Sequence, residues 1–181
     1  MKPFNPDELA AVTIFLGAND CALPESPQHV PIDEFKQNII VMVNKLESHK
    51  IPKNKVVLIT PPIYFQSRFA EYRRSQGDEV PPLRANEQPK LYAHALNEVG
   101  KELGVSVVDT YSAFEADGRG EALFNDGLHF SPIGAELMYN LVVNEIESRV
   151  LSTRGQVELV MNYPPWAEIN SDTFEQSLKN K

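Results

Sequence analysis

Residues 11–20 read Ala-Val-Thr-Ile-Phe-Leu-Gly-Ala-Asn-Asp, an apolar run that ends abruptly in a polar loop. A short, continuous run of apolar, β-prone residues predicts a buried strand of a parallel sheet. Catalytic and ligand-binding loops of such sheets gather at the carboxyl ends of the strands, so we expect Gly17 and Asn19 at the functional edge. An Asn amide there can donate a hydrogen bond to a developing oxyanion; the alternative interpretation is an Asx turn after a strand.

The rest of the chain repeats the order of strand and helix. Apolar residues recur at helical spacing after each of three apolar, β-prone runs. The three pairs are a strand near 10–16 with a helix near 33–49, a strand near 55–60 with a helix near 87–103, and a strand near 105–110 with a helix near 132–150. This alternation predicts an α/β fold with a parallel sheet and right-handed crossovers. Because no linker interrupts it, we expect one domain over residues 1–150 and a C-terminal tail over residues 151–181.

A second polar turn, Asp126-Gly127-Leu128-His129, precedes the last predicted helix. A histidine that acts as a general base needs a carboxylate to hold its ring and to stabilise the imidazolium that forms. Asp126 and His129 are close enough in sequence to make such a pair within one turn. The alternative interpretation is a capped turn whose histidine has only a structural role. Because Ser131 and the proline after it fit the start of a helix, we expect Ser131 to be a helix cap rather than a nucleophile.

Taken together, these segments resemble a known family. The loop Gly17-Ala18-Asn19-Asp20 and residues 126–134 resemble the third and fifth sequence blocks of the SGNH (GDSL) hydrolases. The segments Leu58-Ile59-Thr60-Pro61-Pro62 and Arg84-Ala85-Asn86-Glu87 resemble the branch that contains isoamyl acetate-hydrolysing esterases. The resemblance covers roughly residues 8–150.

The resemblance implies a three-layer α/β/α, flavodoxin-like SGNH hydrolase fold and a role in ester metabolism. It implies hydrolysis of small acyl esters through a serine acyl-enzyme, with a small-molecule ester as the partner. Carried over to this sequence, His129 is the base and Asp126 orients it. Asn19 is then the oxyanion donor, and Gly17 shapes the oxyanion loop. No metal and no cofactor is implied.

The nucleophile is missing from this pattern. In the family, a Gly-Asp-Ser block and a second block with an oxyanion-hole glycine lie upstream of the Asn19 loop. This sequence contains no Gly-Asp-Ser, since Gly77-Asp78 is followed by Glu79. We therefore expect an N-terminally truncated hydrolase domain, holding the third to fifth blocks, whose own ester hydrolysis is near background. The alternative is a non-catalytic truncated isoform that acts as a binding or partner module. Cys21 is a poor substitute nucleophile, because its thiolate would need a nearby base and open access.

Composition narrows the partners and the location. The formal net charge of -8 and the absence of a basic stripe argue against nucleic acid and anionic membranes. The single cysteine allows no internal disulfide. No apolar run approaches the length of about eighteen residues that crosses a membrane. The first residues contain no signal-peptide core. We therefore expect a cytoplasmic protein. The candidate metal ligands match no metal-binding motif in their spacing; they are Asp20, His94, Asp126 and His129.

Three further segments carry expectations. Residues 12–16 have no charge or proline that would blunt an exposed edge, so we expect them to pair with another chain and to allow self-association. The segment 63–83 either walls a substrate pocket or forms a short surface helix near 65–75. In the tail, Trp166 is expected to pack the chain onto the domain, with Tyr163 beside it as a candidate partner contact and a frayed end beyond.

Overall fold

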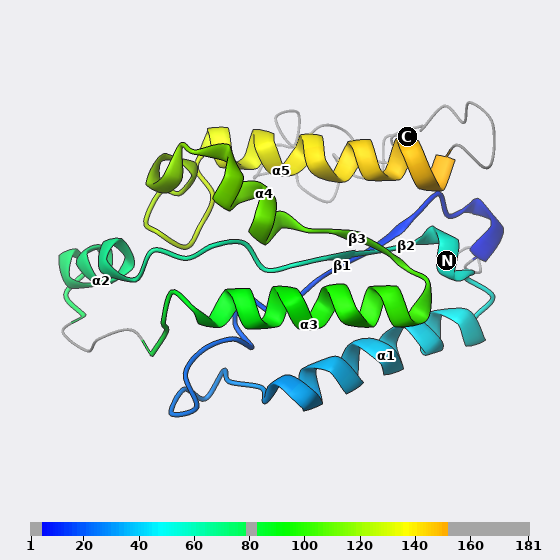
Figure 1. Cartoon of the computed structure of the whole chain (residues 1–181), viewed down its shortest axis with the longest axis horizontal. Helices are drawn as coiled ribbons and strands as arrows, with labels where there is room; N and C mark the ends of the chain where they lie inside the picture. The colour runs from blue at the N-terminus through cyan, green and yellow to red at the C-terminus, as the bar shows by residue number, and fades with distance from the viewer. Residues whose placement is uncertain (1–4, 79–82, 152–181) are drawn as a thin grey trace, which may run out of the picture.

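The structure is a computed structural model that describes residues 5–78 and 83–151. In these residues a parallel sheet carries helices on both faces (Figure 1). The strands, in sheet order, are β1 (Val12–Phe15), β2 (Val56–Ile59) and β3 (Ser106–Val108). Both strand pairs are parallel, with Ile14 beside Leu58 and Leu58 beside Val107. The predicted three-layer α/β/α fold with a parallel sheet is therefore confirmed in this part of the chain.

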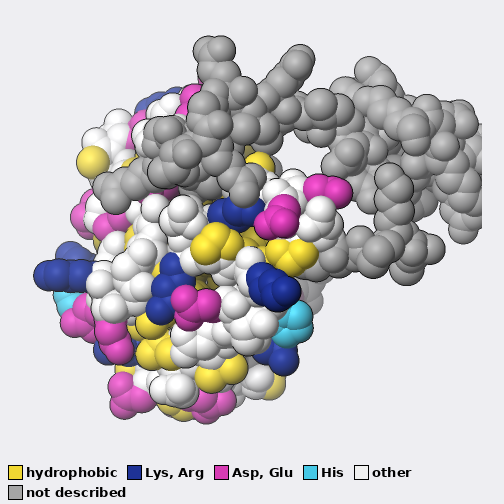
Figure 2. Space-filling model, turned by 90° about the vertical axis from the view of Figure 1, so that its right-hand side faces the viewer, with side chains coloured by type: hydrophobic (Ala, Val, Ile, Leu, Met, Phe, Trp, Pro, Cys, Tyr) yellow, Lys and Arg dark blue, Asp and Glu magenta, His cyan; other side chains and the backbone are white. Residues whose placement is uncertain are grey.

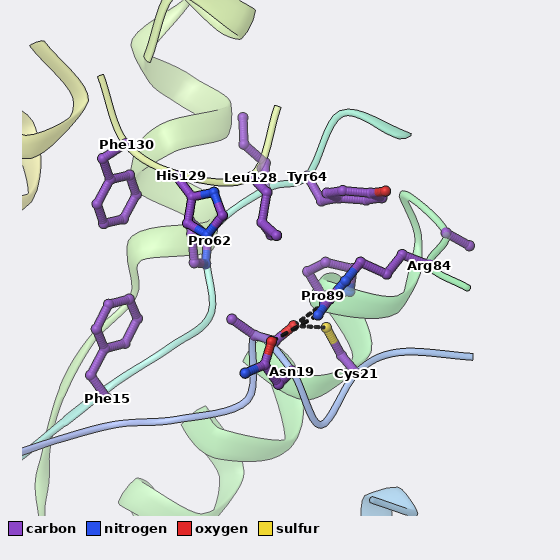
Figure 3. A pocket seen from close by; sticks show the side chains of 13 residues that line it. Phe15, Asn19, Cys21, Pro62, Tyr64, Arg84, Pro89, Leu128, His129 and Phe130 are labelled. Atoms are coloured by element: carbon purple, nitrogen blue, oxygen red, sulfur yellow. Dashed lines mark hydrogen bonds between the residues drawn. The ribbon is translucent and has the colours of Figure 1, made fainter. Parts of the chain in front are cut away.

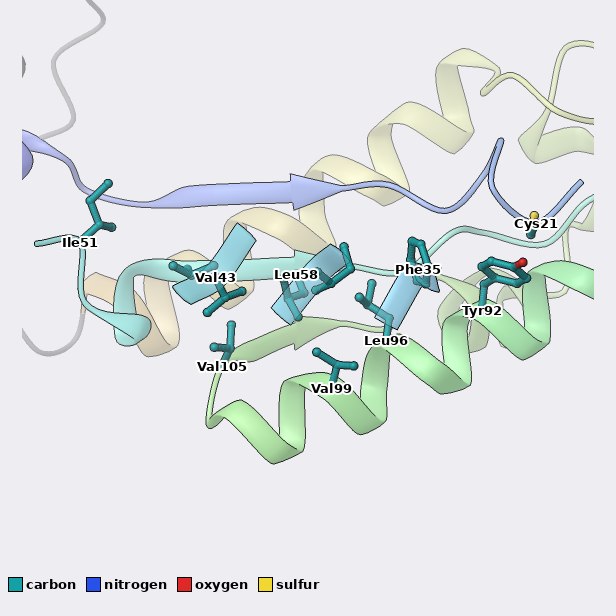
Figure 4. Close-up of a cluster of buried hydrophobic side chains, with 11 residues drawn as sticks. Cys21, Phe35, Val43, Ile51, Leu58, Tyr92, Leu96, Val99 and Val105 are labelled. Atoms are coloured by element: carbon teal, nitrogen blue, oxygen red, sulfur yellow. The ribbon is translucent and has the colours of Figure 1, made fainter. Parts of the chain in front are cut away.

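The two helical layers bury different faces of the sheet. α1 (Ile32–Ser48) and α3 (Gln88–Leu103) cover one face, and α5 (Pro132–Glu145) covers the other (Figure 1). The larger core lies on the α1 and α3 side (Figure 4) and consists of Cys21, Phe35, Ile39, Val43, Ile51, Val56, Leu58, Tyr92, Leu96, Val99 and Val105. On the other face, Val57 and Ile59 pack against apolar side chains of α5. Because β2 is buried on both faces, all four of its residues are apolar.

Local signals explain where the helices begin and end. α3 ends at Gly104, whose φ of 67° is the left-handed conformation that glycine adopts readily after a helix. α4 (Thr110–Asp117), which the sequence patterns did not predict, begins after Asp109. The Asp109 carboxylate caps it by accepting a hydrogen bond from the Ser112 N–H at 3.0 Å. The short elements are η1 (Pro6–Glu8), η2 (Lys53–Lys55), η3 (Gly120–Leu123) and the π-helical turn η4 (Ile146–Leu151).

Of the two interpretations of residues 63–83, the structure shows the short surface helix, and a role in walling a substrate pocket stays a prediction. The segment forms the surface helix α2 (Gln66–Ser75), and the residues just before that helix line a cavity described below. The last predicted helix is shorter than expected. α5 ends at Glu145, and the chain continues into the π-helical turn η4 instead of a regular helix to residue 150.

β1 lies at one edge of the described sheet, and only one of its faces is well covered. Val12 and Ile14 pack against the larger core, whereas Phe15 is 40% exposed and Leu16 is 41% exposed. The strand is therefore an open edge of the described sheet, as expected for residues 12–16, and is not buried on both faces. α5 packs against β2 and β3 and leaves the Phe15 side chain partly open to solvent.

The described surface mixes charges of both signs. On the face drawn in Figure 2, basic and acidic side chains are interspersed and do not separate into patches. None of the helices within residues 5–78 and 83–151 is long and apolar enough to cross a membrane. The predicted cytoplasmic location stays a prediction. The expectations for Tyr163, Trp166 and the tail fall on residues 152–181, which lie outside the described residues.

Candidate active site

The turn over residues 126–129 is fixed by its neighbours on both sides. It follows η3 and precedes α5, and the Asn125 N–H donates a hydrogen bond to the His129 carbonyl at 2.8 Å. Gly127 has a φ of 92°, and a Cβ at this position would lie 2.7 Å from the Phe65 carbonyl oxygen. Glycine is therefore required for the turn to lie against the start of α2.

Ser131 caps α5 directly behind the turn. Its hydroxyl donates to the Ala122 carbonyl at 2.7 Å and accepts from the Gly134 N–H at 3.2 Å. Gly134 is also required, because a Cβ there would overlap the backbone of Leu123. Ser131 is a helix cap, as predicted, and its hydroxyl is engaged with backbone groups on both sides.

Asp126 and His129 form a hydrogen-bonded pair within the turn. The Asp126 Oδ2 lies 2.6 Å from the His129 Nδ1, and Oδ1 accepts from the backbone N–H groups of Leu128 and His129 at 2.8 and 2.7 Å. The Asp126 side chain is 7% exposed, whereas the imidazole is 72% exposed. The carboxylate therefore holds one side of the ring while the other side remains open.

The electrostatics of Asp126 favour its charged form. Burial raises the pKa of the Asp126 carboxyl, but the hydrogen bonds from the His129 ring and from two backbone N–H groups outweigh burial and lower that pKa below its usual value. An ionised carboxylate only accepts hydrogen bonds, so the proton between the two groups belongs to Nδ1 of His129. Nε2 is then the nitrogen that can accept a proton.

The loop after β1 is shaped by Gly17 and presents Asn19. Gly17 has a φ of 109°, and a Cβ there would lie 3.2 Å from the Pro61 ring. Its N–H donates to the Asp20 carboxylate at 3.1 Å, and its carbonyl accepts from the Cys21 N–H at 3.0 Å. Gly17 therefore fixes the conformation of this loop through its own backbone, and its role in shaping an oxyanion loop stays a prediction.

Arg84 contacts this loop from a distant part of the chain. The residue is 9% exposed, and its guanidinium donates to the Asn19 Oδ1 at 2.7 Å, to the Gln28 Oε1 at 3.1 Å and to the Ala18 carbonyl. Asn19 and Arg84 are 65 residues apart. In the sequence, Arg84 stands out only as the first residue of the segment Arg84-Ala85-Asn86-Glu87, and no local pattern links it to Asn19.

A cavity of about 290 Å³ lies between the two polar turns. Asn19 and His129 both line it (Figure 3). Asp126 is not among its lining residues and reaches the site through its hydrogen bond to His129. Its other lining residues are mainly apolar: Phe15, Ala18, Cys21, Pro62, Ile63, Tyr64, Arg84, Ala85, Pro89, Leu128 and Phe130. The structure thus brings the predicted base and the predicted oxyanion donor to one apolar cavity, with Gly17 supporting the loop beneath.

Two further titratable groups line this cavity. Cys21 is 3% exposed, and burial raises the pKa of its thiol to about 11, so the thiolate that a nucleophile needs is disfavoured. The Tyr64 hydroxyl is buried without a hydrogen-bond partner among the described residues, and burial raises the pKa of Tyr64 to about 12. Nothing in the sequence pattern distinguishes Tyr64 from the aromatic residues around it.

The residues considered as metal ligands are engaged elsewhere. Asp20 accepts a hydrogen bond from the loop backbone, and His94 is 76% exposed on α3, 3.7 Å from Glu98. Within residues 5–78 and 83–151, no group of three or more His, Cys, Asp or Glu side chains is placed to hold a metal ion.

Comparison with known sequences identifies relatives over most of the chain. Residues 1–137 match the profile of the GDSL-like lipase/acylhydrolase family. The isoamyl acetate-hydrolyzing esterase 1 homolog of Bos taurus is 37% identical over 175 residues, which cover 95% of this chain and 67% of that protein. The Homo sapiens protein of the same name is 35% identical over 170 residues, which cover 93% of this chain and 65% of that protein. The chain therefore spans about two thirds of the length of the curated relatives it matches.

Solved structures show the same relationship. The lipase/acylhydrolase from Enterococcus faecalis is 32% identical, with a TM-score of 0.61 over 78% of this chain and 63% of that chain. A catalytic mutant of an acetylxylan esterase from Geobacillus stearothermophilus, at 23% identity and a TM-score of 0.55, shares the fold over 76% of this chain and 59% of that chain. The sequence match and the parallel α/β fold agree, and the chain belongs to the GDSL-like lipase/acylhydrolase family.

Proposed function

We propose that this chain carries the general base, the orienting acid and an oxyanion donor of a hydrolase that acts on small carboxylic esters. The observation that carries the proposal is the Asp126–His129 pair, joined at 2.6 Å, which opens on the same cavity as Asn19. The apolar lining and the volume of about 290 Å³ suit a short acyl ester. The names of the relatives, isoamyl acetate-hydrolyzing esterase homologs, point to the same substrate class.

Each of these three residues has a distinct task in ester hydrolysis. His129 takes the proton of an attacking hydroxyl through Nε2 and later returns it to the leaving alcohol. The Asp126 carboxylate, kept charged by its hydrogen bonds, stabilises the imidazolium that forms between these two steps. Asn19 donates its side-chain N–H to the negative oxygen of the tetrahedral intermediate.

The serine nucleophile of this mechanism has no candidate in the site. The 181 residues contain no Gly-Asp-Ser, and no serine is among the described residues that line the cavity. Cys21 is buried with a raised pKa, and Ser131 caps a helix. We therefore infer that the 181-residue chain alone hydrolyses esters at close to the background rate.

A second candidate function follows from the same observation. A cavity with an intact polar pair but without a nucleophile can bind a small ester or its acid product without turning it over. In this alternative the chain acts as a non-catalytic binding or partner module. Binding of small carboxylic acids by the chain without any ester hydrolysis would favour this alternative. Calorimetry measures that binding.

Hydrolysis of p-nitrophenyl acetate tests the proposed function directly. The purified chain is compared with its His129→Ala variant, and a fluorophosphonate probe reports any activated serine. We expect background rates in both proteins and no labelling. A rate that falls in His129→Ala and is accompanied by labelling would instead show that a nucleophile within the 181 residues completes the site.

Self-association through β1 is a separate part of the proposal. Phe15 and Leu16 are 40% and 41% exposed at an edge of the described sheet, and no charge or proline in β1 discourages pairing with a second copy. We expect light scattering to show dimers or larger species at high concentration, and a Thr13→Lys variant, which places a charge on the exposed face, to shift the protein toward monomer. A wild-type monomer at all concentrations would contradict this part.

A further inference from the structure

The Asn19 side chain has to present a nitrogen, not an oxygen, to serve as an oxyanion donor. An Asn amide has similar shape in both orientations about its last side-chain bond, and only its hydrogen bonds decide between them. In the wrong orientation the carbonyl oxygen would face the negative charge of the intermediate and repel it. Something in the structure has to fix the amide for the site to work.

Arg84 supplies that constraint. A guanidinium carries only donors, so the atom of Asn19 that faces it has to be the oxygen. The Arg84 Nη2 lies 2.7 Å from the Asn19 Oδ1, and Figure 3 shows the amide nitrogen on the opposite side of the Asn19 side chain. A charged donor at Oδ1 also polarises the amide and strengthens the hydrogen bonds that its N–H groups donate to a substrate.

The guanidinium is itself held in place. Its other hydrogen bonds go to the Ala18 carbonyl, within the oxyanion loop, and to the Gln28 Oε1 at 3.1 Å. The backbone beside it is tied down too, because the Leu23 N–H donates to the Leu83 carbonyl at 2.8 Å. Because these acceptors engage both Nη groups, Arg84 acts as a fixed hydrogen-bond donor within the protein and is not a free cation for an anionic ligand.

We propose that Arg84 is a positioning residue that locks the Asn19 amide with Oδ1 toward the guanidinium and Nδ2 free to donate to the oxyanion. This inference deepens the proposed function and rests on it for the identity of the oxyanion donor. The geometry that it claims, however, is a property of the folded chain whether or not that chain hydrolyses esters.

The first test reads the Asn19 amide by nuclear magnetic resonance in ¹⁵N-labelled protein. The two Nδ2 protons are assigned by their loss in Asn19→Asp. In wild-type protein we expect one sharp pair displaced from the positions of exposed Asn amides. Arg84→Met and Arg84→Gln remove the obligate donor, so the pair should move toward those positions and broaden, and Arg84→Lys, which keeps a charged donor, should restore part of the displacement. Arg119→Met, at an exposed arginine of α4's C-terminal loop, is the matched control and should leave the pair unchanged.

An unchanged Asn19 pair in either folded variant, Arg84→Met or Arg84→Gln, would overturn the proposal. A measurement on wild-type protein alone also tests the proposal, so the test does not depend on variants that fold. Because both Nη groups of Arg84 are hydrogen bonded, they should give separate resonances, whereas those of exposed Arg74 should average through rotation. Averaged Arg84 signals would mean that the guanidinium is not fixed and would contradict the proposal.

A second test uses sodium butyrate, whose carboxylate stands in for the acid product of a small ester. We expect butyrate to shift the Asn19 Nδ2 protons and its affinity to fall about tenfold in Arg84→Met, the loss expected for one hydrogen bond to a charged group. Absence of butyrate binding to wild-type protein would count against the proposed small-ester site and leave the resonance test of Arg84 intact. Equal affinities in wild type and Arg84→Met would count against Arg84 alone.

Discussion

The two polar sides of the cavity are built in opposite ways. The Asp126–His129 pair joins residues three apart within one turn, whereas the Asn19–Arg84 contact joins residues 65 apart across the fold. The first is held by its own backbone and by the cap of the following helix. The second exists only once the strand, the loop and the segment before α3 have come together. A local motif therefore gives the proposed base and acid, while the proposed oxyanion donor depends on tertiary structure.

The largest expected effect tests whether the Asp126–His129 turn and the start of α5 require glycine at position 134. Gly134→Ala places a methyl group where the Leu123 backbone lies, so we expect a loss of about 3 kcal/mol in the free energy of unfolding. Urea denaturation of the variant and wild type measures it. Ile133→Ala, one residue earlier and 37% exposed, is the control and should cost much less. A Gly134→Ala protein as stable as wild type would mean that α5 can shift away from η3 at little cost.

The next prediction concerns how well the Asn19 loop shields Cys21 from reagents in solvent. Cys21 lies beside the Asn19 loop, and its pKa of about 11 and its burial should make alkylation by iodoacetamide at neutral pH slower than in unfolded protein by on the order of 100-fold. Mass spectrometry after timed quenching gives the rate. Arg84→Met should speed the reaction by loosening the loop, and Asp126→Asn should not. Similar rates in native and urea-unfolded wild type would show that the loop opens freely.

Removal of the charge from Asp126 should have a smaller effect that depends on pH. Because the folded-state pKa lies below the unfolded value, the carboxylate stabilises the protein fully above about pH 4, the ordinary Asp pKa, and this contribution is lost as pH falls through the lower folded pKa. We expect Asp126→Asn to lose about 2 kcal/mol at neutral pH and to show less acid dependence than wild type. Urea midpoints between neutral and acid pH measure both. Parallel pH profiles for the two proteins would contradict the assignment of Asp126 as the charged partner of His129.

The smallest expected effect tests whether the hydrogen bond to Gln28 helps to hold the Arg84 guanidinium. Gln28→Ala removes one of its acceptors and leaves the bonds to Ala18 and Asn19, so we expect a loss of about 1 kcal/mol in unfolding free energy. Denaturation curves of Gln28→Ala, Arg84→Met and the double variant separate the coupling from the individual costs. Full additivity of the two changes would indicate that the Gln28 contact does not support the guanidinium.

The sequence predicts the local features of this molecule better than the long-range ones. Asp126, His129 and the Ser131 cap follow from side-chain chemistry within a few residues, and the order of strands and helices follows from apolar spacing. α4 was missed because its few apolar residues form no clear stripe. The open edge at residues 12–16 was expected, but which of its side chains is exposed depends on which strands α5 covers. The Asn19–Arg84 contact could not be predicted, because nothing near either residue encodes the other.

Phe15 and Phe130 have a consequence for substrate size. Their rings are nearly parallel, at 3° and 6.5 Å between centroids, and both line the cavity. Phe15 ends the strand that delivers the Asn19 loop, and Phe130 follows His129 directly. Two aromatic side chains from separate segments therefore form one wall of the cavity beside His129 and Asn19. Exchange of either ring for a smaller side chain offers a route to redesign this scaffold for bulkier, branched esters without altering the polar residues.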